Sequence, residues 1–228
     1  MRMTLAEAAV AMQGVLRGPD APFLAVSTDS RRVSAGSLFF ALSGAHHDGH
    51  EYVPAALAAG AAAAVVCREE AGAGAPCIVV DDTQLALGRL ALAWRLRLPV
   101  TVVAITGNSG KTTTKELTAA VLRSAASTLA TPGNYNNEIG MPLTLLQLDA
   151  GHRYAVIEMG QGRPGDIAYL AGIARPAIAL VTNVTGAHLG GFGSMEAIAA
   201  GKAEVYASLA GDGVAIVNLD DRFSGYWL

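Results

Sequence analysis

Charged residues and cysteines are both scarce in this 228-residue sequence. Charged side chains make up 15% of it, against about 25% in an average globular protein, and 52% is hydrophobic, which excludes a disordered tail. The net charge of −3 provides no basic surface for a phosphate backbone and argues against nucleic acid as a partner. The two cysteines, Cys67 and Cys77, are too few for a disulfide framework and fit a reducing compartment.

Hydrophobic runs long enough to cross a membrane are lacking as well. The apolar block 55–66 consists mainly of alanine and covers twelve residues, whereas a membrane span needs roughly 20. It predicts a helix that runs into a buried strand. The N-terminal stretch 1–17 contains Glu7 and Gln13, which interrupt it too early for a signal peptide. We therefore expect a soluble, cytoplasmic protein without membrane insertion.

Short apolar strands alternate with helical segments along the chain. In the first half, the pattern predicts helices at 51–59 and 84–97 and strands at 37–42, 62–67 and 77–80. In the second half, it predicts helices at 111–123, 167–173 and 195–209 and strands at 100–105, 154–158, 177–181 and 214–217. Near-continuous apolar strands that alternate with helices are typical of a mostly parallel sheet covered on both faces. The predicted fold class is therefore α/β.

A break in the pattern at Leu98 and Pro99 divides the chain. The residue before a proline is pushed out of the helical conformation, so the helix at 84–97 ends here. We place a domain boundary at this point, with a small α/β domain at 1–98 and a central, mostly parallel-sheet domain at 99–228. Because ligands of such sheets bind beyond the carboxyl ends of the strands, candidate site residues are expected there.

The strongest chemical signal follows the strand at 100–105. A loop there leads into the helix at 111–123 and has the sequence Thr106-Gly107-Asn108-Ser109-Gly110-Lys111-Thr112-Thr113. Glycines let backbone N–H groups point inward, and the helix N-terminus adds a positive dipole, so the loop suits an anion. In the pattern G-x-x-x-x-G-K-[ST], the lysine, here Lys111, reaches the β- and γ-phosphates, and the hydroxyl, here of Thr112, binds Mg²⁺. Ile105 replaces the pattern's first glycine, so this is a shorter form of a P-loop ATPase-like site.

Single residues elsewhere in the second domain are weaker candidates. Glu158 ends the strand at 154–158 and could hold a metal, although a solvated charge at a strand end explains it equally well. His188 follows the next strand in a glycine-rich loop, where a metal ligand or an ordinary loop histidine would fit. Lys202 and Glu204 lie on a helix with an apolar face, and by position alone they are a pair of exposed helical charges.

Polar residues also gather in three short segments. The stretch TPGNYNNEIGMP at 131–142 contains Asn134, Asn136 and Asn137. Asparagines form turns, but three amides in four positions favour ligand recognition through neutral donors and acceptors. In the first domain, STDSRR at 27–32 and SGAHHDGH at 43–50 are similarly polar within an apolar region.

Taken together, these segments resemble the Mur ligase family of peptidoglycan synthesis. The resemblance covers essentially the whole chain and rests on TDSRRVSAGSLFFALSG, TGNSGKTTTKE, GNYNNEIGMPLTLL, VIEMG and HLGGFGS, in the family's order. A phosphate loop without the first glycine is the family's own form, so Ile105 is no objection. The asparagine-rich segment is most similar to that of the member that adds D-alanyl-D-alanine to UDP-N-acetylmuramoyl-tripeptide.

The resemblance implies an ATP-dependent, amide-forming ligase that works through an acyl phosphate. The first domain would bind the UDP end of the sugar nucleotide, with contacts from Ser30, Arg31, Asp48 and His50, while Asn134, Asn136 and Asn137 would meet the muramoyl-peptide part. ATP would lie on the residues Gly107, Asn108, Ser109, Gly110, Lys111, Thr112 and Thr113. The catalytic residues would be Lys111, His188 and Lys202, and the ligands of Mg²⁺ Thr112, Glu158, His188 and Lys202. Lys202 matches a lysine that relatives carbamylate, which replaces an ammonium with a metal-binding carboxylate.

The resemblance also leaves expectations about extent and alternatives. Family members continue into a third domain, so we expect a truncated chain with an incomplete central sheet, an exposed edge and little or no ligase activity of its own. The full-length protein is expected to be a monomer. The alternatives are the related Mur ligase that adds the third peptide residue, a folylpolyglutamate synthase, or a non-catalytic module that binds ATP and a UDP-sugar. The folate enzymes should lack TDSRR and GSLFFAL, and the Mur neighbour should lack NYNNEIGMP.

Overall fold

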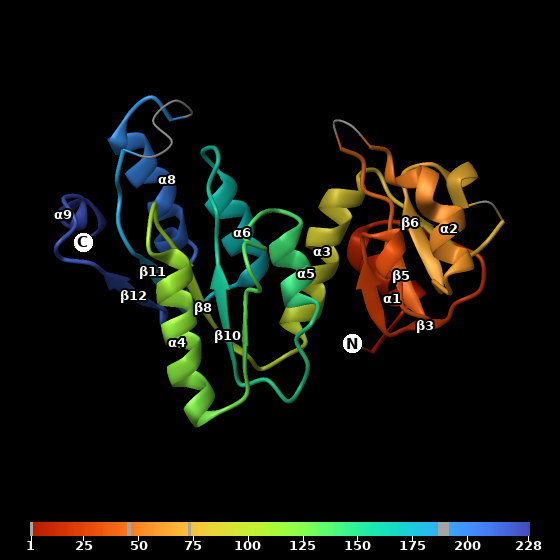
Figure 1. The fold of residues 1–228 in the computed structure, drawn as a ribbon, viewed down its shortest axis with the longest axis horizontal. Coiled ribbons are helices and arrows are strands. Elements are labelled where there is room, and N and C mark those ends of the chain that lie inside the picture. Colours follow the sequence, from red (N-terminus) through yellow and green to blue (C-terminus); the bar gives the residue numbers. More distant parts are fainter. Residues whose placement is uncertain (1, 45–46, 73, 187–191) are drawn as a thin grey trace. The chain divides into compact units, whose positions relative to one another are not determined.

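The computed structural model describes residues 2–44, 47–72, 74–186 and 192–228, which form two compact units, Met1–Trp94 and Arg95–Leu228 (Figure 1). The boundary predicted from the sequence lies after residue 98, whereas the division falls inside helix α3 (Thr83–Leu96). Arg95 explains the difference, because its guanidinium donates to the carbonyls of Leu98, Val100 and Ala174 and so ties the end of α3 to the second unit.

A five-stranded sheet in the order β2-β7-β6-β5-β4 forms the centre of the first unit. Neighbouring strands are parallel except β2 and β7, which are antiparallel. A separate antiparallel pair joins β1 and β3. The strands are β1 Met3–Thr4, β2 Val15–Arg17, β3 Pro22–Phe23, β4 Ala25–Ser27, β5 Ser37–Phe40, β6 Ala63–Val66 and β7 Cys77–Val79.

Helices and 3₁₀ turns connect these strands: α1 Leu5–Met12, η1 Ser30–Arg32, η2 Gly49–Tyr52, α2 Val53–Ala58, η3 Glu69–Gly72 and α3. The predicted helix at 51–59 is thus a 3₁₀ turn followed by a short α-helix, because the Asp48 side chain caps the turn and a proline stands in the first turn of α2. The block 55–66 is a helix followed by a buried strand, as predicted. Within the described ranges, no helix has the length and apolar character needed to span a bilayer.

A second five-stranded sheet, β12-β11-β8-β10-β9, forms the centre of the second unit, and every neighbouring pair in it is parallel. Its strands are β8 Thr101–Thr106, β9 Thr128–Ala130, β10 Tyr154–Glu158, β11 Ile178–Val181 and β12 Val214–Val217. From β8 in the middle, the chain builds β9 and β10 on one side and β11 and β12 on the other. This reversal makes the carboxyl end of β8 the place where ligands of such sheets bind.

The helices of the second unit cover both faces of its sheet (Figure 1). They are α4 Lys111–Ala125, α5 Gly140–Leu145, α6 Asp166–Ala174, α8 Met195–Ala207 and α9 Ser224–Trp227. On one face, Ala119 and Leu122 of α4 pack with Val103 of β8. Side chains alternate along a strand, and Val102 and Ala104, which point to the other face, are also buried where α6 and α8 meet β8. The predicted α/β class is confirmed.

Strand β12 lies at one edge of this sheet. Val214 and Ile216 on it are 52% and 46% exposed, although the sequence reads as a continuous apolar strand. The opposite edge, β9, and the short helix α5 fall in a segment for which the sequence analysis predicted no regular structure.

Candidate functional site

The predicted phosphate loop joins β8 to α4 at the carboxyl edge of the second sheet. Gly107 and Gly110 have positive φ angles, +144° and +77°, which L-residues with side chains rarely adopt. Gly107 has a second reason to be glycine, because a Cβ there would run into the hydroxyl of Thr182. The helix that follows is 15 residues long, and its first backbone N–H groups have no acceptor within the helix. The local structure therefore suits an anion at this position.

Residues just after β11 hold the loop in shape. Asn183 accepts from the backbone N–H of Ser109 at 3.0 Å and donates its amide to the carbonyl of Ser109 at 3.1 Å. The hydroxyl of Thr182 donates to the same carbonyl at 2.7 Å, and the N–H of Asn108 donates to the carbonyl of Asn183. Neither Thr182 nor Asn183 was predicted from the sequence to belong to the site. Their signal is a pair of polar residues directly after a strand that ends at the same sheet edge.

Lys111 and Thr112 extend from the first turn of α4. The Lys111 amine donates to the carbonyls of Gly107 at 2.9 Å and Asn108 at 3.3 Å, so it lies over the loop. The Thr112 hydroxyl donates to Glu158 Oε2 at 2.9 Å. Thr113 is exposed. Lys111 and Thr112, which have predicted roles toward phosphate and metal, therefore both lie beside the phosphate loop.

Glu158 is 2% exposed, which excludes the alternative of a solvated charge at the strand end. Its Oε2 accepts from Thr112, and its Oε1 accepts from the Asn136 amide at 2.7 Å. Its backbone N–H donates to the hydroxyl of Thr131 at 2.9 Å. One buried carboxylate therefore joins the phosphate loop to the asparagine-rich segment.

The donor set around Glu158 fits a hard cation such as Mg²⁺. A carboxylate oxygen and a hydroxyl oxygen, the ligand types that Mg²⁺ prefers, lie 2.9 Å apart beside the phosphate loop. In the described part of the chain, no group of three or more histidine, cysteine, aspartate or glutamate side chains forms a closed metal site. Such an open arrangement is typical of Mg²⁺ sites that are completed by phosphate oxygens and water. Of the two other predicted ligands, His188 lies outside the described residues, and Lys202 is on α8.

Lys202 on α8 is 2% exposed, and its amine donates to Gln161 Oε1 at 3.1 Å. Burial and, secondarily, the nearby charge of Lys111 lower the pKa of Lys202 from 10.5 to about 8. The Gln161 side chain packs against Gly201, where a Cβ would overlap its Nε2, and this buried Nε2 has no hydrogen-bond partner among the described residues. Neither Gln161 nor its position was singled out from the sequence.

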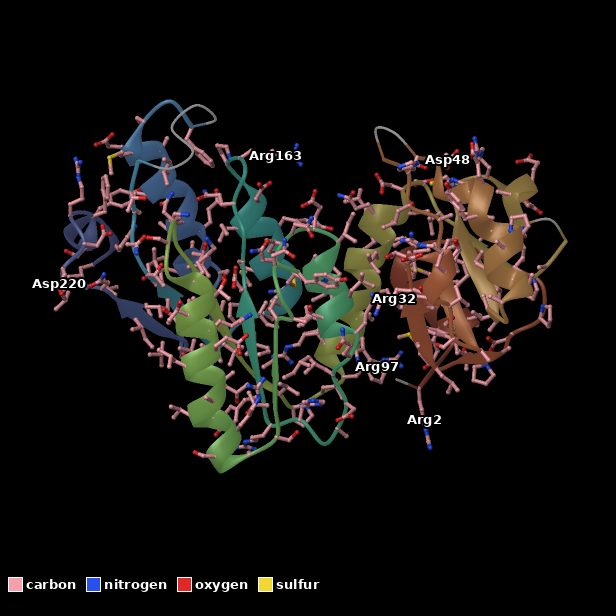
Figure 2. The ribbon with its side chains drawn as sticks, in the orientation of Figure 1. Arg2, Arg32, Asp48, Arg97, Arg163 and Asp220 are labelled. Atoms are coloured by element: carbon pink, nitrogen blue, oxygen red, sulfur yellow. The ribbon has the colours of Figure 1, made fainter. Side chains whose placement is uncertain are left out.

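Glu204, two residues further along α8, caps helix α6. Its two carboxylate oxygens accept from the backbone N–H groups of Gly165 and Ala168, each at 2.9 Å. The interpretation of Lys202 and Glu204 as exposed helical charges is therefore wrong. The cap fixes the start of α6 and hence the turn between β10 and α6 that carries Gln161, on which Figure 2 labels Arg163.

The three asparagines of the segment 131–142 differ in their surroundings. Asn136 donates to Glu158, and its carbonyl accepts from the N–H of Gly160 at 2.7 Å. The Asn137 side-chain oxygen accepts from the N–H groups of Ile139 and Gly140, at 3.3 and 2.8 Å, which is a turn-forming role. Asn134 is exposed. The structure thus brings only Asn136 to the carboxylate.

In the first unit, Ser30 and Arg31 form the 3₁₀ turn η1. Asp29 accepts from the Arg31 backbone N–H at 3.0 Å and pairs with its guanidinium through both oxygens, each at 2.9 Å. The Arg31 hydrogen bond holds the pKa of Asp29 at about 2. The Arg31 side chain is 87% exposed, so this ion pair is weak and the guanidinium stays accessible to an anion.

Asp48 and His50, by contrast, are bound to the protein itself. Asp48 accepts from the His50 backbone N–H, from His50 Nδ1 at 2.6 Å and from Arg68 at 2.8 Å; Figure 2 labels it on this loop. His50 Nε2 accepts from the N–H of Cys67, which requires the proton to be on Nδ1. The His50 side chain is 5% exposed, so the ring holds the turn in place. A direct contact between His50 and a ligand stays a prediction.

The profile of the Mur ligase middle domain matches residues 105–228, which is 124 of the 228 residues, and the profile of the Mur ligase family catalytic domain matches residues 23–95. The first match contains the phosphate loop, Glu158 and Lys202. The chain belongs to the Mur ligase family. Similarity to individual Mur ligases extends over nearly the whole chain.

This Mur ligase chain is 44% identical to the UDP-N-acetylmuramoyl-tripeptide–D-alanyl-D-alanine ligase of Escherichia coli (strain K12) over 220 residues, 96% of this chain and 48% of that protein. MurF from Acinetobacter baumannii matches with a TM-score of 0.94 at 39% identity, covering 100% of this chain and 51% of that one. MurF ligase from Thermotoga maritima in complex with ADP matches with a TM-score of 0.80 at 37% identity, over 86% and 46%. The chain spans about half the length of the curated relatives it matches.

Proposed function

We propose that this chain acts in the ATP-dependent ligation of D-alanyl-D-alanine to UDP-N-acetylmuramoyl-tripeptide, a cytoplasmic step of peptidoglycan biosynthesis. The observation that carries the proposal is the pair of hydrogen bonds on Glu158. One comes from Thr112 of the phosphate loop and the other from Asn136 of the segment with the most specific resemblance. A nucleotide on the loop and a sugar nucleotide on the asparagine segment would therefore meet at this carboxylate. The similarity to proteins named for this activity supports the proposal.

In the proposed reaction, the terminal carboxylate of the tripeptide attacks the γ-phosphate of ATP, and an acyl phosphate forms. The amine of D-alanyl-D-alanine then attacks the activated carbonyl, and phosphate leaves as the amide bond forms. Such phosphoryl transfer depends mainly on positioning and on neutralising charge. Lys111 supplies both, because a phosphate oxygen offers its ammonium a stronger acceptor than the loop carbonyls that hold it now.

Thr112 and Glu158 would hold Mg²⁺. When bound, the ion neutralises charge on the transferring phosphoryl group. The chain's own contribution is to fix the two ligands: Thr131 and Asn136 hold the Glu158 backbone and carboxylate, while the first turn of α4 fixes Thr112. His188 is proposed as a further metal ligand from the resemblance alone.

Lys202 is proposed to act after carbamylation. Its neutral amine would attack CO₂, forming a nitrogen–carbon bond and releasing a proton. Because the pKa of Lys202 is lowered to about 8, a larger fraction of the amine is neutral near physiological pH than for an ordinary lysine. The buried Gln161 Nε2 would then lie next to a new acceptor.

Three alternatives to this function were named from the sequence. A ligase that adds the third peptide residue is disfavoured by the NYNNEIGMP segment, whose Asn136 is built into the site. A module that binds ATP and a UDP-sugar without catalysis is separated from the ligase only by turnover of the three substrates. The folate enzymes are disfavoured because the unit Met1–Trp94, with its TDSRR turn, is present.

Calorimetric titration with ADP, with and without Mg²⁺, tests the nucleotide site. Lys111→Met should weaken binding in both conditions by about 10- to 100-fold, equivalent to the ~1.5–3 kcal/mol of a hydrogen bond to a charged group. Glu158→Gln should abolish the enhancement by Mg²⁺ and leave metal-free binding unchanged. Arg123→Gln, at the far end of α4, is the matched control and should bind as the wild type does. Wild-type protein that fails to bind ADP would contradict the proposal.

A further inference from the structure

Lys115 is a fully buried lysine to which the proposed phosphate and metal sites assign no role. The sequence contains only three lysines, Lys111, Lys115 and Lys202, and its 13 other basic residues are arginines. The first and third are the amines of the proposed site. Lys115 lies on α4 one turn after Thr112, with 0% of its surface exposed. Burying an ammonium is costly unless it is paired, so its partners should reveal what it does.

Among the residues that the structure describes, the Lys115 amine has two partners. It donates to the carbonyl of Thr131 at 2.7 Å and to Glu116 Oε1 at 2.9 Å. Glu116 supplies the opposite charge from a side chain that is 56% exposed, so its carboxylate stays largely hydrated, whereas the Lys115 side chain is fully buried. The bond to Thr131 is wholly buried, since Thr131 is 1% exposed. The carbonyl of Thr131 is therefore the buried partner of the amine, and Glu116 is its charged partner at the surface.

Thr131 is the residue at which β9 stops pairing with β10. The register pairs Val156 with Ala130, and the N–H of Thr131 still donates to the carbonyl of Val156. If the parallel ladder continued, the N–H of Glu158 would donate to the carbonyl of Thr131. It donates instead to the hydroxyl of Thr131, and Lys115 takes the carbonyl. The hydroxyl and the carbonyl of Thr131 thus both accept a hydrogen bond, although the backbone leaves the sheet at this residue.

This departure from the sheet brings Asn136 to the site. Five residues after Thr131, Asn136 crosses the end of β10, accepting from the N–H of Gly160 and donating to Glu158. Had β9 continued beside β10, the segment could not fold back over that strand end.

We propose that Lys115 is a positioning residue: its ammonium ends the β9–β10 ladder at Thr131, and this holds Asn136 and Glu158 in place for the sugar-nucleotide substrate. The inference rests on the proposed function for the identity of that substrate. It assigns Lys115 no contact with nucleotide or metal. The phosphate loop, which Thr182 and Asn183 hold from the other side, should not depend on it.

The test measures two ligands on the full chain by calorimetry, UDP-N-acetylmuramoyl-tripeptide and ADP. ADP is titrated without Mg²⁺, because the proposed metal site includes Glu158. Lys115→Met, which keeps the approximate length of the side chain, should lower the affinity for the sugar nucleotide by about tenfold or more, equivalent to ~1.4 kcal/mol. Affinity for ADP should stay within about twofold, as for a substitution remote from the ligand. Glu116→Gln is the matched control, because it removes the charge of the exposed partner of Lys115 and leaves the bond to Thr131. It should leave both affinities within the same twofold range.

A second variant covers the case in which Lys115→Met does not fold. Thr131→Val keeps the carbonyl that Lys115 binds and removes only the acceptor for the N–H of Glu158. It should therefore weaken binding of the sugar nucleotide and leave binding of ADP unchanged. If the affinities for both ligands fell equally, Lys115 would have a merely structural role and the inference would be overturned. An unchanged affinity for the sugar nucleotide in a folded variant would overturn it as well.

Hydrogen exchange separates this inference from the proposed function. If the wild type binds ADP but not the sugar nucleotide, the proposed function fails. Lys115 is then judged by the amides of Glu158 and Gly160, which should exchange about tenfold faster in Lys115→Met and at the wild-type rate in Glu116→Gln. Unchanged exchange of these two amides would refute the positioning role whatever the substrate.

Discussion

Replacing Lys202 with methionine is expected to stabilise the protein at neutral pH, although the lysine belongs to the proposed site. The pKa of the amine falls from 10.5 to about 8, chiefly because the folded protein buries it. At about 1.36 kcal/mol per pKa unit, the ammonium destabilises the folded state by about 3 kcal/mol at pH 7. Methionine removes this penalty but leaves Gln161 Oε1 without its donor, which costs about 1 kcal/mol. The variant should therefore be more stable by about 2 kcal/mol.

The dependence on pH has a definite sign. The folded-state pKa lies below the unfolded-state value, so between about pH 8 and 10.5 the unfolded chain binds more protons than the folded one. The free energy of unfolding of the wild type therefore rises with pH over this range. Because the variant has no such group, its advantage should shrink by about 2 kcal/mol between pH 7 and pH 10.

Urea denaturation at pH 7 and pH 10, in CO₂-free buffer with a metal chelator, measures both effects. The chain has two tryptophans, Trp94 and Trp227, one in each unit, so a Trp94→Phe background makes fluorescence report the second unit alone. Since the sequence holds three lysines, ¹³C-lysine NMR can follow the titration of Lys202 directly. Arg123→Met, at an exposed position, should show no pH-dependent difference. If Lys202→Met were less stable than the wild type by the same amount at both pH values, the reasoning would be refuted.

Two further substitutions test the architecture around the site. Gly107→Ala should abolish ADP binding and destabilise the second unit by about 1–3 kcal/mol, because residue 107 has φ +144° and a Cβ there would meet Thr182. Calorimetry measures the binding and urea denaturation the stability. Binding of ADP as tight as in the wild type would contradict the expectation. Glu204→Gln should destabilise the second unit by about 1 kcal/mol, because one of the two bonds that cap α6 is lost, whereas Glu196→Gln at the exposed start of α8 should change stability by less than about 0.5 kcal/mol. Equal urea midpoints for the two glutamate variants would argue against the cap.

Much of the second unit could be predicted from the sequence because its signals are local. Strands 154–158 and 214–217 have the bounds predicted, and the phosphate loop is identified by glycines between a strand and a helix. The rule that ligands bind at the carboxyl ends of parallel strands directed attention to Glu158, which is buried there and bonded to the phosphate loop; its role stays a prediction. Helix α1 also had a local signal, the Thr4–Glu7 capping box, which the sequence analysis did not use.

The remaining parts of the site depend on pairing between distant segments. Asn183 supports the phosphate loop only because β11 lies beside β8, and Lys115 acts only where β9 leaves β10. Neither residue stands in a pattern that predicts its partner. The segment 140–145 forms a helix although it contains Gly140 and Pro142, residues that ordinarily mark turns. Asp48 and His50 were predicted to contact the ligand; their side chains hydrogen-bond within the turn and to Cys67, which the sequence could not show, and the ligand contact stays a prediction.

Calorimetric titration of the folded 228-residue chain with UDP-N-acetylmuramoyl-tripeptide tests the central claim most directly. We expect saturable binding that Asn136→Ala weakens by about tenfold or more, since that variant removes the amide that joins the segment to Glu158. Ser30→Ala should weaken it as well, through the UDP end. The absence of saturable binding by protein that circular dichroism shows to be folded, and that still binds ADP, would contradict the account.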